Sequence, residues 1–203
     1  MFAIVESGSI TSMPRGNKAI QIGDIKYPAT IYTLWSEAER NAIGVYTIEE
    51  DKTNLKDEEW YINTNISYAY DASSNKVKGT YGTATARPIA DVLFTQADED
   101  AGRGTKDELN YRGLKYLKKE IIDGQCAQML APSDWRVVRE QETGDAMDSG
   151  WKTWRASVRT KCNSMQTQID NAANIDALAA LFTYTEQEDK SITRPLGEFP
   201  VKS

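Results

Sequence analysis

The most regular pattern of apolar and polar positions lies between Trp151 and Ile169. Large apolar residues recur there at steps of three and four, which lines them up on one face of an α-helix. They are Trp151, Trp154, Val158, Cys162, Met165 and Ile169. The positions between them carry Lys152, Arg155, Arg159, Lys161 and Gln166. We predict an amphipathic helix whose tryptophan-led face packs against a neighbouring element.

A second helical pattern precedes this one. Thr105 and Glu108 have the spacing of a capping box, so we expect a long helix to begin at Thr105. The apolar residues assigned to its stripe are Leu109, Leu114, Leu117, Ile121 and Met129. Gly113 and Gly124 each weaken such a helix by up to roughly 1 kcal/mol relative to alanine. The helix therefore needs a packed neighbour.

The remaining C-terminal signals complete a helical domain over residues 105–183. A turn at Ser133-Asp134-Trp135 and a polar loop over 140–150 should connect the two helices. A break at Asn174 and a last short helix capped by Asp176 should follow. We predict an antiparallel helical hairpin or small bundle, which exposes apolar edges unless another surface covers them. Residues 184–203 form an extended tail with little to pack against, able to reach another subunit.

Residues 1–86 alternate in the manner of β-strands and predict a small β-rich domain with one short helix. That helix spans Ser36 to Ile43, where Ser36 and Glu39 form a capping box and Gly44 ends the helix. The expected loops cover residues 8–17 and 49–59. The expected strands are 2–5, 19–22, 25–27, 45–48, 60–70 and 76–81. Together the two halves predict an α+β fold.

Residues 87–104 between the two domains predict a short helix and a linker. The apolar residues Ile89, Val92, Leu93 and Ala97 suit a helix. The acidic stretch that begins at Asp98 departs from the EF-hand calcium loop, because Arg103 replaces its glycine and Leu109 its glutamate. We therefore predict no metal site here, and no cofactor elsewhere.

Composition excludes several classes of function. The chain has no histidine, so neither a Ser-His-Asp nor a Cys-His mechanism can be built. Its two cysteines, Cys126 and Cys162, are too few for a four-sulfur zinc site, and we expect both to be buried free thiols. The net charge of −6 opposes general nucleic-acid binding. We expect no secretory signal, and no apolar run is long enough for a membrane span.

One motif in the helical half resembles a known family. Leu130 is followed by Ser133-Asp134-Trp135, and later by Trp154-Arg155 and Val158-Arg159. This arrangement resembles the C-terminal module of tailed-bacteriophage tail proteins, the tail assembly chaperone or tail-fibre-associated family. In that family a tyrosine usually stands in place of Trp154 and a leucine in place of Val158. A second similarity to small phage tail proteins covers Tyr27-Pro28, Leu34-Trp35-Ser36 and residues 39–44.

The resemblance implies a bacteriophage tail protein, made in the host bacterial cytoplasm and located in the virion. Its partners would be other tail, baseplate or fibre proteins, with self-association as a further option. An assembly chaperone absent from mature virions fits the same residues. The residues that we assign to the core or an interface, rather than to catalysis, are Trp135, Trp151, Trp154, Arg155, Arg159, Leu196 and Phe199.

An enzyme is the alternative from another class, and a glycan-binding or glycan-cleaving tail-tip protein fits best because carboxylate pairs survive the exclusions above. The candidate acids are Asp57, Glu58 or Glu59 with Asp71, beside an aromatic surface. That surface would comprise Tyr61, Tyr68, Tyr70 and Tyr81. The competing interpretation places alternate tyrosines in the core.

Overall fold

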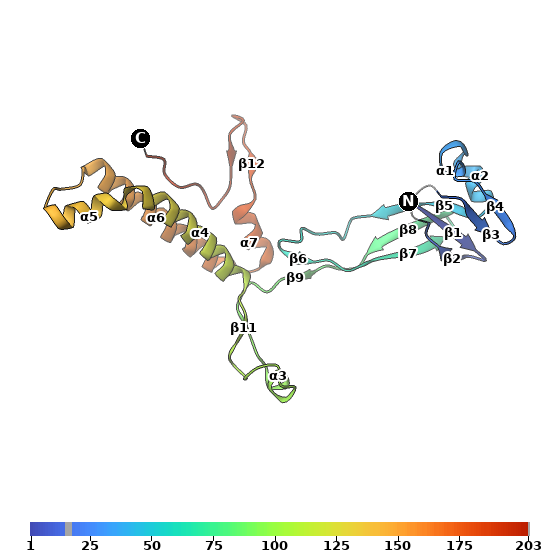
Figure 1. The fold of residues 1–203 in the computed structure, drawn as a ribbon, viewed down its shortest axis with the longest axis horizontal. Helices are drawn as coiled ribbons and strands as arrows, with labels where there is room; N and C mark the ends of the chain where they lie inside the picture. The colour runs from blue at the N-terminus through green and yellow to red at the C-terminus, as the bar shows by residue number, and fades with distance from the viewer. Residues whose placement is uncertain (15–17, 203) are drawn as a thin grey trace. The chain divides into compact units, whose positions relative to one another are not determined.

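The computed structural model describes residues 1–14 and 18–202 and has the predicted α+β fold. It divides into two compact units, Met1–Thr85 and Ala86–Ser203. Most strands lie in the first unit and the long helices in the second (Figure 1). None of the described helices is both long and apolar enough to cross a bilayer.

The first unit is built on a five-stranded sheet with the strand order β2-β1-β5-β8-β7. Its strands are β1 (Phe2–Glu6), β2 (Ser9–Ser12), β5 (Val45–Asp51), β7 (Ile66–Asp71) and β8 (Lys76–Tyr81). β5 and β8 run parallel, and the other neighbours are antiparallel. The predicted hairpin of β7 and β8 is confirmed.

Each face of this sheet buries an apolar cluster. Ile4 and Val45 lie on one face, under α1 (Ile31–Leu34) and the β3–β4 hairpin (Ile20–Ile22 and Ile25–Tyr27). The other face carries Ala3, Val5, Ile48 and Val77, against which Ile10, Tyr46, Tyr68 and Tyr70 pack. Tyr68 and Tyr70 are therefore partly buried core residues.

Local signals placed α2 (Glu37–Ala42) correctly. The Ser36 hydroxyl accepts from the Glu39 amide, and the Glu39 carboxylate accepts from the Ser36 amide at 2.8 Å, which forms the predicted capping box. Gly44 follows with φ +81°, and a Cβ there would meet the Val5 carbonyl oxygen at 2.6 Å. Glycine is required at this position by both the backbone angle and the close approach.

Four predictions in this unit were wrong. One short helix was expected, but α1 precedes α2. The expected loop over 8–17 contains β2, because Ser7 and Gly8 turn the chain with positive φ and return Ile10 to the core; residues 15–17 lie outside the described part. The charged residues 49–51 extend β5, because their backbone pairs with β8. The strand expected over 60–70 is two: β6 (Tyr61–Ile62), which pairs with β9 (Thr85–Ala86), and β7.

The second unit begins with an arm in place of the predicted helices. β10 (Val92–Leu93) pairs with β11 (Leu109–Tyr111), and α3 (Gln96–Asp100) lies between them. The capping box here is formed by Thr95 and Asp98. The start expected for the long helix at Thr105 was wrong, because Leu109–Tyr111 form β11. The long helix α4 (Leu114–Leu130) starts after Gly113, whose amide donates to Asp91 at 2.8 Å.

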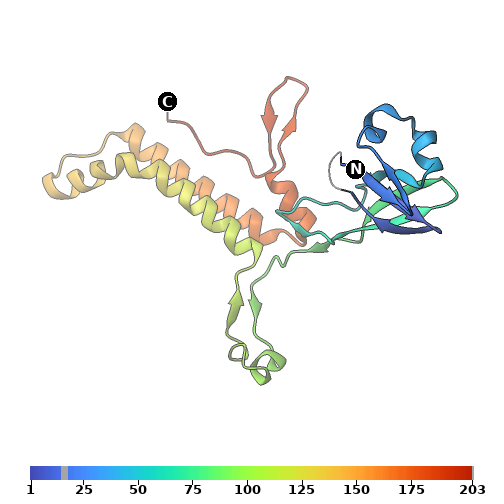
Figure 2. The same cartoon turned by 45° about the vertical axis from the view of Figure 1, so that its right-hand side comes forward.

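The helical hairpin is confirmed. α4 and α6 (Ser149–Asn171) lie side by side, as both views show (Figures 1 and 2). The short helix η1 (Ala131–Ser133) and α5 (Asp134–Thr143) connect them, in place of the turn expected at 133–135 and the first part of the loop expected over 140–150. The last helix, α7 (Ile175–Phe182), follows α6. Asn174, rather than Asp176, caps α7 by accepting from the Ala177 amide.

The two long helices were predicted with different success. The apolar stripe of α6 is correct: Val158, Cys162, Met165 and Ile169 are buried. The stripe of α4 was assigned to the wrong face, because Leu117 and Ile121 are exposed. The buried positions are Lys118, Ile122 and Cys126. Lys118 is buried because its side chain reaches the Phe182 ring, with the ammonium 5.0 Å from the centroid.

The C-terminal tail folds back on its own unit, which corrects the prediction of a segment with little to pack against. β12 (Thr185–Glu186) and β13 (Ile192–Thr193) form a short hairpin. Leu196 is fully buried, and its carbonyl accepts from the Lys161 ammonium at 2.8 Å. Ser203 lies outside the described residues.

Candidate functional site

Arg155 joins three parts of the chain at the end of the helical hairpin. Its Nη1 donates to the carbonyl oxygen of Leu130 at 2.8 Å and to the hydroxyl of Ser133. Its Nη2 donates to Asp134 Oδ1 at 2.6 Å. We call Leu130, Ser133, Asp134 and Arg155 the arginine corner. Four residues of the motif that resembles phage tail proteins thus form one hydrogen-bonded unit.

Burial explains why Arg155 needs all three acceptors. The residue is 5% exposed and Ser133 is fully buried, whereas the Asp134 side chain is 59% exposed. A charge removed from water costs several kcal/mol unless hydrogen bonds replace its hydration. The sequence pattern placed Arg155 on a polar face of the helix. That prediction was wrong, because α5 and η1 cover this side of α6.

A stack of aromatic and cationic side chains lies next to the arginine corner. The Arg136 guanidinium is 4.5 Å from the Trp135 ring centroid and 4.7 Å from that of Trp151. Trp151 meets Trp154 edge to face at 5.6 Å. The Trp154 indole donates to the Pro200 carbonyl oxygen at 2.9 Å, which ties the tail to α6. We call Trp135, Arg136 and Trp151 the indole–guanidinium stack.

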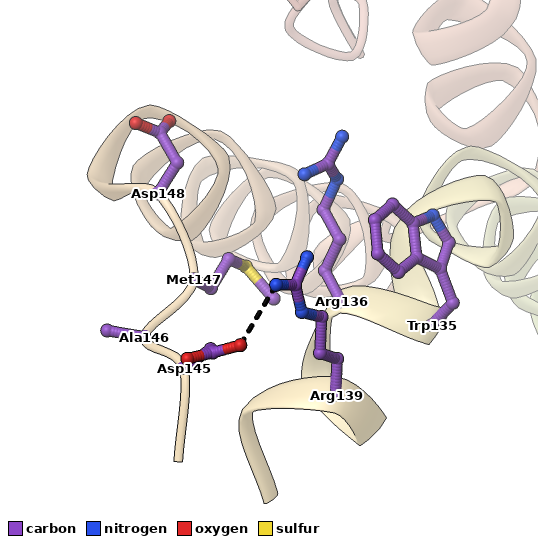
Figure 3. A pocket seen from close by; sticks show the side chains of 7 residues that line it. All are labelled: Trp135, Arg136, Arg139, Asp145, Ala146, Met147 and Asp148. Carbon is purple, nitrogen blue, oxygen red and sulfur yellow. Dashed lines mark hydrogen bonds and ion pairs between the residues drawn. The ribbon is translucent and has the colours of Figure 1, made fainter. Parts of the chain in front are cut away.

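Part of this stack lines a small hollow between α5 and the start of α6 (Figure 3). The hollow has a volume of about 110 Å³. Arg136 and Arg139 extend from the same side of α5, and the segment 145–148 lies opposite them (Figure 3). The lining residues are Trp135, Arg136, Arg139, Asp145, Ala146, Met147 and Asp148.

The charged residues of the hollow differ in how they are paired. Arg139 donates to Asp145 at 2.9 Å, and this hydrogen bond, with a second one from Thr143, lowers the pKa of the Asp145 carboxyl. Asp148 caps α6 by accepting from the Gly150 and Trp151 amides. Arg136 contacts two indoles and pairs with no carboxylate in the described part of the chain.

Exposure separates the residues that we expected in a core or interface. Trp135 is 51% exposed, so it does not fill the core; α5 begins at Asp134 and turns the indole outward. Val138, one turn further, is 50% exposed, and we call Trp135 and Val138 the exposed α5 pair. Arg159 is exposed, whereas Trp151, Trp154 and Phe199 are half-buried.

The acids nominated for glycan cleavage have structural partners. Asp71 accepts from the Ser73 and Ser74 hydroxyls and from Lys78, and these bonds, led by Lys78, hold its pKa well below its usual range. Asp57 accepts from the Glu59 amide at 2.9 Å. A carboxyl with a lowered pKa is a poor general acid.

The other candidate groups occupy structural positions. Asp98 caps α3 and pairs with Arg103 at 2.7 Å. Across the described ranges no group of three or more acidic or cysteine side chains is arranged to hold a metal ion. Cys126 and Cys162 are buried free thiols, as predicted.

Sequence reasoning missed Ser133 and Arg136 as members of this site. Ser133 is a short polar residue before a helix, a pattern usually explained by capping. Its hydroxyl instead accepts a hydrogen bond from Arg155 and donates one to the Leu130 carbonyl oxygen. The stacking contact of Arg136 is with Trp151, a residue 15 positions away on another helix, and it leaves no local signal. Comparison of the chain with models of known protein families, with curated proteins and with solved structures found no match.

Proposed function

We propose that this chain is a non-enzymatic bacteriophage tail protein, associated with the baseplate or the tail fibre, that acts through protein–protein contacts. The observation that carries the proposal is the arginine corner. The resemblance to phage tail proteins rests on residues far apart in sequence, and Arg155 hydrogen-bonds to Leu130, Ser133 and Asp134. A motif whose members bind one another supports a shared structural module better than a set of scattered identities.

The exposed α5 pair supports contact with another protein. Trp135 and Val138 lie three positions apart on one helix, so both project from the same side. Exposed aromatic residues are enriched where proteins bind partners, and tryptophan often contributes much of the binding free energy. Leu117 and Ile121 on α4 add a second exposed apolar ridge in the same unit.

The glycan-cleaving alternative receives less support. Two of its tyrosines pack against the core of the sheet, and Asp71 is held by serine and lysine donors. The assembly chaperone alternative uses the same contacts as the proposed tail component. It differs only in whether the protein remains in the finished particle.

The location of the chain during infection tests the proposal. The protein should be quantified by mass spectrometry in purified particles of the phage that encodes it and in the cleared lysate of infected cells. A tail component occurs in particles in a fixed ratio to other tail proteins. A chaperone is bound to a tail or fibre protein in the lysate and is depleted from particles. Absence from both contradicts both functions.

A further inference from the structure

We propose that Arg136 is the binding residue for a carboxylate group of a partner protein, which deepens the proposed function and rests on it. The guanidinium carbon lies over both indoles, 4.5 Å from the Trp135 centroid and 4.7 Å from the Trp151 centroid. Both rings are therefore within cation–π distance of its charge. Its remaining interactions are the N–H donors around its edge, which point within the plane.

Those donors have no anionic partner within the described residues. Arg139, three positions further on the same helix, already binds Asp145. The arginine–carboxylate pair is thus formed once in this hollow, and the second guanidinium is available for an external acid. An arginine in contact with two indoles has lost side-chain freedom before a ligand binds, which reduces the entropy cost of binding.

The size of the hollow limits the ligand. A single water molecule needs roughly 10–15 Å³ of accessible space. About 110 Å³ accommodates a carboxylate and the methylene groups that carry it, but not a folded element. The fitting ligand is an acidic side chain presented by a peptide segment, with the exposed Trp135 beside it for apolar contact.

The negative net charge of the chain means that an acidic peptide must be bound by a specific local group. The whole chain carries a net charge of −6, so it repels acidic peptides at long range. Binding of such a peptide then requires a local group that donates several hydrogen bonds. Guanidinium–carboxylate pairs are commonly bidentate, a geometry that a lysine ammonium does not reproduce.

A binding titration tests the assignment on the full chain. The probe is a tetraglutamate amide with fluorescein on its amino terminus, measured by fluorescence anisotropy beside a tetraglutamine amide that carries the same label. We expect the wild type to bind tetraglutamate and not tetraglutamine. R136Q and R136K should each weaken binding at least tenfold. K26Q, which removes an exposed cation from β4, should leave the Kd within twofold.

Other outcomes overturn the inference. Equal losses in R136Q and K26Q mean that general charge, rather than the stack, attracts the peptide. Competition by free glutamate or acetate as strong as by unlabelled tetraglutamate assigns the hollow to a small carboxylate instead of a protein. No binding to the wild type also refutes it.

The peptide titration and the measurement on phage particles can contradict the two proposals independently. If the chain is present in particles but R136Q binds tetraglutamate normally, the carboxylate site is wrong and the tail function stands. If the peptide results hold but the chain is absent from particles and from lysate complexes, the tail function is wrong.

Discussion

Arg155 connects the end of α4 to α6 through hydrogen bonds to main-chain and side-chain oxygens. Two of its acceptors, the Leu130 carbonyl and the Ser133 hydroxyl, lie in the interior of the corner, whereas Asp134 faces water. The buried acceptors therefore depend more on Arg155 than Asp134 does. This difference separates the effects of neighbouring substitutions.

Arg155→Met should destabilise the second unit by about 3 kcal/mol, because it leaves Leu130 and Ser133 without their buried donor. Asp134→Asn should cost less than about 1 kcal/mol, since the exposed amide oxygen still accepts. Arg159→Met removes an exposed arginine from the same helix and should stay within about 0.5 kcal/mol. Urea titrations followed by tryptophan fluorescence measure these differences, and equal effects in all three variants would refute a buried corner.

The thiol of Cys162 gives a pH-dependent prediction. Burial, together with hydrogen bonds to Cys126 and Asp123, raises its pKa from 9 to about 12. Between these two pKa values, the thiol is therefore neutral in the folded protein and ionised in the unfolded chain. Its stabilising contribution is fully present below pH 9 and is lost as the pH rises through about 12.

Alkylation measures this difference, because the thiolate is the reactive form. At pH 8.5 and low iodoacetamide, Cys162 in the native protein should react far more slowly than the same residue in urea. Peptide mass spectrometry gives the modified fraction at each time. Rapid labelling in the native state at this pH would mean that the thiol is neither buried nor shifted.

At the scale of elements, short-range signals predicted some structure well. The Ser36–Glu39 capping box with Gly44, and the three- and four-residue steps of α6, are complete within one segment. The arm depends instead on β10 meeting β11 across 16 positions. Gly113 shows why local patterns are not sufficient. A Cβ there would meet the Ala90 carbonyl carbon at 2.2 Å, a contact that no local sequence pattern predicts.

The candidate site was less predictable than the fold. The sequence motif singled out Trp135 and Arg155, but the structure reverses the environments expected for them: the arginine is buried and the tryptophan exposed. Helical periodicity assigns apolar residues to the inside, and it has no means to represent a buried cation that three oxygens satisfy. Arg136 could be recognised as part of the site only once Trp151, on another helix, was known to lie beside it.

The C-terminal tail behaves as part of the helical unit. Leu196→Ala should destabilise it by roughly 2–5 kcal/mol, because the side chain is completely buried against its own unit. Val201→Ala, at a residue that is 88% exposed, is the matched control and should change stability by less than about 0.5 kcal/mol. The urea midpoints of unfolding of the two variants and the wild type measure both effects. If both variants behave as the wild type does, the tail is not folded on the helices.

At the scale of the whole molecule, we propose that the function lies in a surface rather than in a reaction. The second unit combines a rigid corner with exposed apolar side chains on α5 and α4. A rigid base allows exposed residues to bind a partner without a large entropy cost. We propose that the exposed α5 pair joins this chain to a phage tail protein.

The most direct measurement is the ratio of this chain to a major tail protein in purified phage particles that carry defined variants. Trp135→Ala with Val138→Ser should lower that ratio at least tenfold while the far-ultraviolet circular dichroism stays unchanged. The control, Ile192→Ser with Val201→Ser, removes apolar side chains that are 67% and 88% exposed elsewhere in the unit and should leave the ratio as in the wild type. Equal incorporation of both folded variants would contradict the claim.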